Sequence, residues 1–245
     1  MYGIIGKKLG HSFSAKFFNE KFKREGLPET YNLFPIPDIK EFPALIKDNQ
    51  DLKGLNVTIP YKSEVIPYLQ ELSPEAKAIG AVNVIKIKRN GDSIHLEGHN
   101  TDSIGFRDSL SPLLNPNIKK ALILGTGGAS KAVAYILKQF GIDYTFVSRT
   151  PKENQLSYDD LTKEILEDNL LIVNTTPLGT FPDIDESPSL PYQYITPDHL
   201  CYDLVYNPEE TQFLKKSASQ GAKIKNGIEM LHGQALAAWD IWKSD

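Results

Sequence analysis

The sequence predicts an α/β fold in two domains, the first of which has a mostly parallel sheet. Three observations lead to this prediction. Short apolar runs alternate with helical patterns along most of the chain, which is typical of strands joined by crossover helices. A glycine-rich turn, Gly125-Thr-Gly-Gly128, separates one such apolar run from a helical pattern. The length of 245 residues exceeds the commonest size of a single domain.

The first domain is predicted over residues 1–100 and begins with an alternation of strands and helices. The expected strands are residues 2–6, 30–36 and 52–58, and the expected helices are residues 15–26, 39–48 and 61–69. Ser73 and Pro74 suit the N-cap and the first position of a further helix. Asn90-Gly91 is a strong hairpin signal and joins the expected strands 81–88 and 93–97. A helix over 102–110 and a linker over 111–117 follow.

The second domain is predicted over residues 101–225, and its first strand is the apolar run Ala121–Leu124. The glycine turn and a helix through Leu137 follow, and this strand–turn–helix unit makes the domain Rossmann-like. The other expected elements are strands at 144–148, 170–174, 200–204 and 222–225, a surface loop at 183–196 and a helix at 209–219. Only a short polar stretch separates Arg149 from Leu156, so we expect the usual crossover helix there to be lost or reduced to a turn.

The C-terminal segment, residues 226–245, is predicted to join the first domain. Its helix, expected over 230–242, carries an apolar face of Leu231, Leu236, Ala238, Trp239 and Trp242. An apolar helix face is normally buried against another element, and we expect this one to pack on the first domain.

Charge and composition argue against several classes of function. The net charge of −4 disfavours nucleic acid or an anionic membrane as a partner, because both favour a basic surface. No apolar run reaches membrane-spanning length, and the N-terminus lacks the pattern of a signal peptide. Cys201 is the only cysteine, so no intrachain disulfide is expected and a cytoplasmic location is predicted. We expect a monomer or a homodimer that acts on a small molecule.

The glycine turn is the first candidate binding site. Gly125, Gly127 and Gly128 leave room for a pyrophosphate to approach backbone N–H groups and the N-terminus of the following helix. Ser130 stands where the motif has its third glycine or alanine. A tight strand-to-helix turn without a ligand would also use glycines.

The residues after the next strand indicate which nucleotide binds. An acidic residue there would bind the ribose 2′-hydroxyl of NAD, but the sequence reads Ser148-Arg-Thr-Pro-Lys152. The Arg149 guanidinium suits a 2′-phosphate, so the sequence favours NADP over NAD. The lack of an acidic residue at this position also weakens an interpretation as a methyltransferase. The alternative is that Arg149 and Lys152 only face water.

Polar residues near predicted strand ends are the candidates for chemistry. Lys62 falls in the first turn of an expected helix, whose dipole would lower its pKa toward neutrality; an ordinary solvated lysine is the alternative. Asp102 could position Lys62 or simply cap the helix that it begins. Ser12 and Ser14 could present loop hydroxyls to a carboxylate, or be plain loop serines. The five histidines show no metal-ligand spacing, so no metal site is predicted.

The chain resembles the shikimate dehydrogenase family from its first strand to its last helix. The matching stretches are His11-Ser-Phe-Ser14, Asn56-Val-Thr-Ile-Pro-Tyr-Lys62, Gly80-Ala-Val-Asn83, Asn100-Thr-Asp102, Gly125-Thr-Gly-Gly-Ala-Ser130, Asn174-Thr-Thr-Pro-Leu-Gly179, Asp203-Leu-Val-Tyr-Asn-Pro208 and Gly227-Ile-Glu-Met-Leu-His-Gly-Gln234. The resemblance implies NADPH-dependent, reversible reduction of 3-dehydroshikimate to shikimate in aromatic amino-acid biosynthesis.

The resemblance also implies a role for each candidate residue. Lys62 would be the proton donor and acceptor, with Asp102 as its partner. The substrate carboxylate would be held by Ser12 and Ser14, with Tyr206 nearby, and the ring hydroxyls by Thr58, Asn83, Asp102 and Gln234. The NADP phosphates would lie on Gly125, Gly127, Gly128 and Ala129, and the 2′-phosphate on the motif of Ser148, Arg149, Thr150 and Lys152. The nicotinamide side would be lined by Thr175, Thr176, Pro177, Gly227 and Met230.

The sequence departs from the family pattern at several places. Ala15 replaces a proline, Phe18 stands where a histidine is usual, Thr180 replaces a common methionine, and the chain is short after Thr150. None of these changes removes a proposed catalytic group. Two alternatives stay open: a quinate/shikimate dehydrogenase that uses NAD, and a non-catalytic relative that binds a nucleotide.

Overall fold

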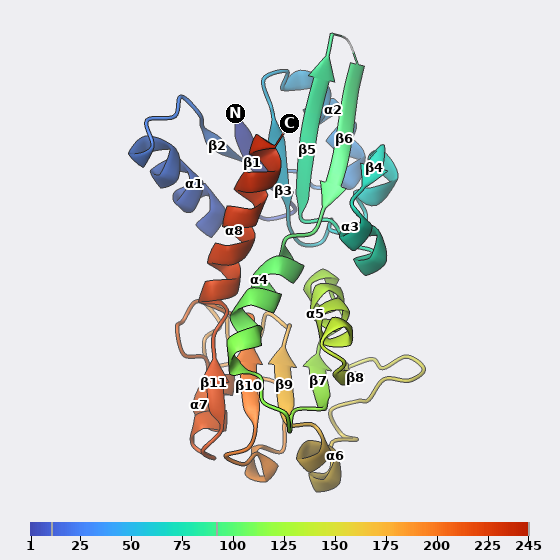
Figure 1. The fold of residues 1–245 in the computed structure, drawn as a ribbon, viewed down its shortest axis with the longest axis vertical. Coiled ribbons are helices and arrows are strands. Elements are labelled where there is room, and N and C mark those ends of the chain that lie inside the picture. Colours follow the sequence, from blue (N-terminus) through green and yellow to red (C-terminus); the bar gives the residue numbers. More distant parts are fainter. Residues whose placement is uncertain (11, 92, 245) are drawn as a thin grey trace. The chain divides into compact units, whose positions relative to one another are not determined.

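The computed structural model describes residues 1–10, 12–91 and 93–244, which form two compact units (Figure 1). Unit 1 consists of Met1–Thr101 and Ala235–Asp245, and unit 2 of Asp102–Gln234. His11, the first residue of the His11–Ser14 stretch, lies outside the described residues. None of the helices in the described ranges is long and apolar enough to cross a membrane.

Unit 1 is built on a sheet with the strand order β2-β1-β3-β5-β6-β4. The central strand β1 (Tyr2–Gly6) pairs in parallel with β2 (Tyr31–Pro35) and β3 (Gly54–Val57). The hairpin of β5 (Val84–Asn90) and β6 (Ser93–His99) is antiparallel, as predicted, and β5 also runs antiparallel to β3. The short β4 (Glu71–Leu72) pairs in parallel with β6.

The helices of unit 1 bury both faces of this sheet. The helices are α1 (Phe13–Arg24), α2 (Phe42–Asp48), α3 (Pro74–Ile79) and the last part of α8 (Ile228–Lys243). In α8, Ala235, Ala238, Trp239 and Trp242 join the same core cluster as Tyr2 and Phe18, so this part of the helix packs within unit 1, whereas residues up to Gln234 belong to unit 2. Leu236 was expected on the buried face and is 49% exposed, because its neighbours Ala235 and Ala238 define a face that points away from it.

The helix predicted over 61–69 is wrong. Tyr61–Val65 forms turns, and only Ile66–Tyr68 (η2) is a short 3-10 helix. Pro67 lies inside the predicted span and has no N–H to continue an α-helix. The segment between Pro60 and Pro67 is therefore too short for a regular helix.

Unit 2 is a parallel sheet with the strand order β11-β10-β9-β7-β8. The strands are β7 (Lys120–Leu124), β8 (Asp143–Val147), β9 (Leu171–Asn174), β10 (Leu200–Asp203) and β11 (Lys223–Lys225). The helices are α4 (Asp102–Leu110), α5 (Gly128–Gln139), α6 (Lys163–Asp168) and α7 (Gln212–Ala218), with α8 beginning in this unit. β8 lies on one side of β7, and the next strand of the chain, β9, lies on the other side, so the order of strands reverses at β7. In doubly wound sheets, ligands bind at the carboxyl ends of the strands beside such a reversal.

The first part of the connection after β8 contains no helix, as the sequence predicted for the stretch from Arg149 to Leu156. Residues 149–162 contain no helix, and Leu156 instead makes a single parallel bridge to Val147. The Leu156 N–H donates to the Phe146 carbonyl (2.9 Å), and its own carbonyl accepts from the Ser148 N–H (2.8 Å). The sequence did not reveal α6, a six-residue helix whose N-cap Thr162 accepts from the Ile165 N–H.

Candidate active site

Lys62 and Thr58 lie in the turn that follows β3. Both are half-buried, and Thr58 is held by its N–H, which donates to the Ile5 carbonyl (2.9 Å). The Lys62 carbonyl accepts from the Val82 N–H (2.6 Å). The expected helix dipole at Lys62 is not formed, because residues 61–65 are turns. The candidacy of this lysine therefore rests on its place at the carboxyl end of a central strand, not on a helix N-terminus.

Asn83 and Thr101 hold each other inside unit 1. The Asn83 Oδ1 accepts from the Thr101 N–H (2.7 Å), and its Nδ2 donates to the Thr101 hydroxyl (3.0 Å). Both residues are buried, and Asn83 follows Val82, which bonds the Lys62 backbone. Thr101 leads directly into Asp102, the buried first residue of α4. The Asn83–Thr101 pair thus fixes Thr101, the last residue of this part of unit 1, on the strand that begins after Asn83.

Ser12 and Ser14 were both expected in a loop. The structure instead places them at the start of α1. Ser12 is the N-cap and accepts from the Ala15 N–H (3.4 Å), whereas Ser14 is in the first helical turn and is buried. The phenol of Tyr31 is fully buried, and burial raises its pKa well above the ordinary value, an effect that the nearby Ser14 side chain opposes. Ser14 therefore belongs to the interior of unit 1, beside Tyr31.

The glycine turn after β7 has the backbone geometry that a dinucleotide needs. Gly125 has φ +100°, and a Cβ there would come within 3.0 Å of Thr175 Oγ1, so glycine is required. Gly127 is the N-cap of α5 without a side-chain cap, and an added Cβ would meet nothing within 4 Å. The first turn of α5, which begins with Gly128 and Ala129, thus faces open space with a positive dipole end. This cradle fits a pyrophosphate.

The basic turn after β8 is compact and exposed. The Thr150 N–H donates to the buried Ser148 hydroxyl (3.2 Å), and the Lys152 N–H donates to Gln155 Oε1 (3.1 Å). Arg149, Thr150 and Lys152 are all exposed. Two cationic side chains on one short turn fit a phosphate monoester, and they also fit a plain solvated turn.

A buried polar cluster joins the carboxyl ends of β9 and β10. Asn174 Oδ1 accepts from the N–H and hydroxyl of Thr176, and its Nδ2 donates to Asp203 Oδ1 (2.9 Å). Asp203 Oδ2 accepts from the Thr211 hydroxyl (2.6 Å), and burial raises the pKa of Asp203 to about 6. Thr175 is tied by its hydroxyl to the Leu124 carbonyl (2.6 Å). The cluster orders the segment that contains Thr175, Thr176 and Pro177.

The sequence interpretation gave no role to Asn174 and Asp203 themselves. Both are fully buried, with no exposed surface on either side chain. Each directly ends a run of apolar strand residues, and a polar residue in that position was the signal that could have revealed them.

The remaining candidates lie around β10 and the start of α8. Gly227 is required by close packing, because a Cβ would lie 2.1 Å from the Leu204 carbonyl oxygen. Met230 is buried in the core of unit 2, and Gln234 is buried with its Nε2 donating to the Leu231 carbonyl (3.0 Å). Tyr206 is half-buried, and burial raises its pKa.

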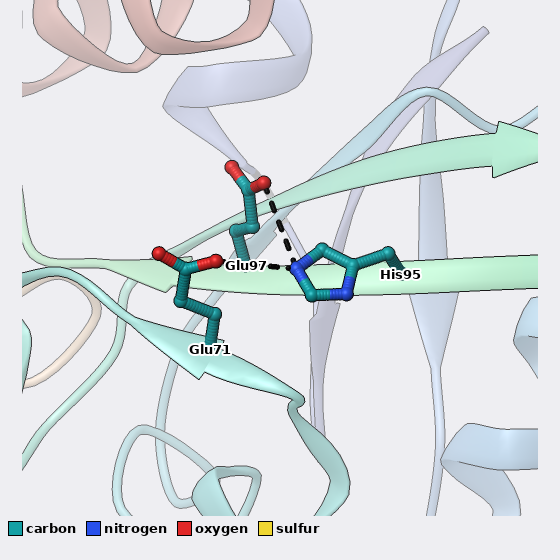
Figure 2. Close-up of side chains that lie close together, drawn as sticks. All are labelled: Glu71, His95 and Glu97. Atoms are coloured by element: carbon teal, nitrogen blue, oxygen red, sulfur yellow. Dashed lines mark hydrogen bonds and ion pairs between the residues drawn. The ribbon is translucent and has the colours of Figure 1, made fainter.

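Glu71, His95 and Glu97 form a cluster on β4 and β6 that has the donor types of a metal site (Figure 2). His95 Nε2 lies 3.3 Å from Glu71 Oε2 and 3.7 Å from Glu97 Oε1. Glu97 also pairs with Lys88 of β5 at 2.7 Å, which already supplies a cation. With Lys88 beside Glu97, the cluster is described as a cross-strand ion-pair network.

Comparison with known proteins identifies the family. A family model described as the shikimate dehydrogenase substrate binding domain matches residues 4–85. The NADP(+) shikimate dehydrogenase of Clostridium beijerinckii is 40% identical, over 99% of this chain and 91% of the relative. That of Desulforamulus reducens is 37% identical, over 98% of this chain and 88% of the relative. The chain belongs to the shikimate dehydrogenase family.

Solved structures of the shikimate dehydrogenase family share the fold over nearly the whole chain. The shikimate 5-dehydrogenase of Thermus thermophilus, solved with NADP(H) and shikimate, superposes with a TM-score of 0.85 at 30% identity. It covers 99% of this chain, and this chain covers 92% of it. A chorismate mutase/shikimate 5-dehydrogenase fusion protein from Clostridium acetobutylicum gives a TM-score of 0.85 at 37% identity, covering 99% of this chain and 90% of that one. The predicted family and fold class are confirmed.

Proposed function

We propose that the protein is an NADP-dependent shikimate dehydrogenase that reversibly reduces 3-dehydroshikimate to shikimate in aromatic amino-acid biosynthesis. The observation that carries this proposal is the likeness to NADP(+) shikimate dehydrogenases over almost the full length of the chain. The likeness to a solved relative that holds both NADP(H) and shikimate supports the same pair of ligands. The role in biosynthesis and the single, buried Cys201 support a cytoplasmic location.

We assign substrate binding to unit 1 and NADP binding to unit 2. The match to the substrate binding domain model lies entirely within unit 1. Unit 2 supplies the uncapped α5 N-terminus, the open space at Gly127 and the parallel sheet. Gly125, Gly127, Gly128 and Ala129 would hold the NADP phosphates, and Ser148, Arg149, Thr150 and Lys152 the 2′-phosphate. Thr175, Thr176, Pro177, Gly227 and Met230 would line the nicotinamide side.

The chemistry divides between the cofactor and the residues of this chain. NADPH, when bound, supplies the hydride for the ketone carbon. Lys62 donates a proton to the oxygen that becomes negative and takes it back in the reverse direction. Its positive charge stabilises the developing alkoxide where it forms. Asp102 would be the partner of Lys62 and would bind a ring hydroxyl.

The other substrate contacts fix the position of the ring. Ser12 and Ser14 would donate to the carboxylate, with Tyr206 nearby. The ring hydroxyls would be bound by Thr58, Asn83, Asp102 and Gln234. Asn83 is well suited to this role because Thr101 already orients its amide. Contacts of this kind lower the Michaelis constant and align the reacting atoms.

One spectrophotometric assay tests the proposed function. Purified protein is mixed with NADP and shikimate, and the NADPH absorbance band is followed. We expect rapid NADPH formation with this pair, and slow NADH formation when NAD replaces NADP or slow NADPH formation when quinate replaces shikimate. If the rates with NAD and with quinate equal those with NADP and shikimate, the broader quinate/shikimate enzyme is favoured. Tight NADPH binding without turnover would favour a non-catalytic relative.

A further inference from the structure

The segment that leaves the end of β8 forms a loop with a closed base (Figure 1). Leu156 bridges Val147 in parallel, so the chain returns to the strand that it has just left. The Ser148 N–H donates to the Leu156 carbonyl (2.8 Å), and the Leu156 N–H donates to the Phe146 carbonyl (2.9 Å). The segment between, residues 149–155, contains no helix and projects from this fixed base; we call it the basic turn.

The tip of the basic turn is a β-turn that begins at Lys152 and ends at Gln155. The Gln155 N–H donates to the Lys152 carbonyl (3.1 Å), which is the usual bond across the four residues of such a turn. The Gln155 side chain also reaches back, and its Oε1 accepts from the Lys152 N–H (3.1 Å). Both backbone polar groups of Lys152 are therefore bonded to one residue, which restricts the backbone of Lys152 to one conformation.

Asn154 determines the type of this β-turn. Its φ is +62°, and it is the only non-glycine residue of the described ranges with a positive φ. A positive φ at the third position, with none at Glu153 in the second, is the pattern of a type II turn, which favours glycine or asparagine at the third position. A β-branched residue with this φ would be strained. The sequence therefore specifies one geometry for a turn whose tip is exposed to solvent.

The basic turn carries two cations that repel each other, Arg149 and Lys152. A phosphate monoester has more than one negative charge near neutral pH and can bind both cations at once. Bringing two long side chains to one group costs conformational entropy, and the cost is smaller when their backbone is already fixed. On the Arg149 side, the Thr150 N–H donates to the buried Ser148 hydroxyl (3.2 Å). On the Lys152 side, Gln155 supplies the corresponding bond.

We propose that Gln155 and Asn154 are positioning residues for the 2′-phosphate of NADP. They fix the backbone of Lys152 so that its ammonium and the Arg149 guanidinium bind the same phosphate group. This inference rests on the proposed function, which places the 2′-phosphate on the basic turn. It predicts that changes at Gln155 and Asn154 alter the affinity for ligands that carry a 2′-phosphate and leave the affinity for NAD unaltered.

The first test is calorimetric titration of the full chain with adenosine 2′,5′-bisphosphate, which carries the 2′-phosphate, and with NAD, which lacks it. We expect Gln155→Ala to weaken binding of the bisphosphate about three- to tenfold, as for one lost hydrogen bond, and binding of NAD by less than about twofold. The matched control is Asn115→Ala, which removes an amide Oδ1 that accepts the Asn117 N–H (2.9 Å) in another exposed turn of unit 2. This control should change neither affinity.

A pair of variants at Asn154 separates the turn geometry from a direct contact of the asparagine side chain. Glycine accepts a positive φ, so Asn154→Gly should bind adenosine 2′,5′-bisphosphate within about twofold of wild type. Valine disfavours this φ, so Asn154→Val should bind it at least about fivefold more weakly, because the type II turn is lost. Equal affinities of the two variants for the bisphosphate would overturn the proposal.

A double-mutant cycle shows whether Gln155 acts through Lys152 or contacts the phosphate itself. Gln155→Ala should weaken binding of adenosine 2′,5′-bisphosphate clearly less in the Lys152→Ala background than in wild type. An equal effect in both backgrounds would overturn the proposal, because a direct contact does not depend on Lys152.

Arg149→Ala distinguishes failure of this inference from failure of the proposed function. If Arg149→Ala binds adenosine 2′,5′-bisphosphate as tightly as wild type, the basic turn does not hold the 2′-phosphate, and the cofactor assignment falls together with the inference. If Arg149→Ala binds the bisphosphate weakly and Gln155→Ala binds it as wild type does, the cofactor assignment stands and only the inference is overturned.

Discussion

Asp203 provides a direct test of how burial acts in unit 2. Its carboxylate is fully buried at the end of β10 and accepts from Asn174 Nδ2 (2.9 Å), the Val205 N–H (3.0 Å) and the Thr211 hydroxyl (2.6 Å). These bonds lower the pKa of Asp203, but burial is the larger effect and raises it from 3.8 to about 6. Asp203→Asn removes the titration. The amide oxygen can keep the bonds from Asn174 and Val205, and the amide nitrogen can donate to the Thr211 hydroxyl.

The sign of the effect follows from proton linkage. Between about pH 4 and pH 6 the unfolded chain releases the Asp203 proton while the folded protein keeps it. The stability that this group contributes is therefore fully present below about pH 4 and is lost as the pH rises through about 6. The raised pKa of about 6, against 3.8, corresponds to about 3 kcal/mol. Relative to wild type, Asp203→Asn should gain about that amount of unfolding free energy from pH 4 to pH 7.

The assay is urea unfolding of both proteins at several pH values, followed by far-ultraviolet circular dichroism. Tryptophan fluorescence is unsuitable because Trp239 and Trp242, the two tryptophans of the chain, both belong to unit 1. Asp159→Asn makes the same exchange at an exposed position of unit 2 and is the control. The argument from burial would be refuted if the difference in unfolding free energy between Asp203→Asn and wild type changed by less than about 0.5 kcal/mol from pH 4 to pH 7.

Three further predictions concern catalysis, cofactor choice and packing. Lys62→Ala should lower kcat by about two to four orders of magnitude with little change in substrate affinity, and near-normal turnover in the same assay would contradict its role as proton donor. Arg149→Ala should raise the Michaelis constant for NADP about tenfold without changing that for NAD, whereas Lys163→Ala, an exposed cation elsewhere in unit 2, should change neither. Gly105→Ala should lower the unfolding free energy of unit 2 by about 1–3 kcal/mol, because the new Cβ would lie 2.3 Å from the Met230 carbonyl oxygen. Circular dichroism would check it, and stability equal to wild type would contradict that close contact.

Local signals in the sequence predicted the order of elements well. The hairpin at Asn90-Gly91, the Ser73 cap and the absence of a helix between Arg149 and Leu156 each depend on a few neighbouring residues, and all three predictions are confirmed. The helix at 61–69 failed because its pattern of apolar residues outweighed Pro67 in the prediction. The error changed the argument for Lys62, since a dipole requires a helix.

Side-chain partners were harder to predict than elements. The sequence indicates that a buried Asn83 would need a hydrogen-bond partner, but not that Thr101 supplies it. The same holds for Asn56 and Asn174, each of which lies in a central strand and bonds a residue more than 20 positions away. The choice among many polar residues is made by the packing of the strands, which no short pattern encodes.

Ser130 shows how a mismatch to a motif can preserve its physics. The third glycine of a dinucleotide turn allows the helix to pack closely on the strand, and a polar side chain there would be costly if it were buried without a partner. Ser130 is 1% exposed, and its hydroxyl donates to the Gly127 carbonyl at 2.7 Å. The small side chain therefore keeps the close packing, and its one polar atom is satisfied within the turn. Because the Ser130 hydroxyl donates to a carbonyl within the turn, it does not cap the N–H groups at the start of α5. The α5 N-terminus therefore has no side-chain cap, as the proposed phosphate site requires.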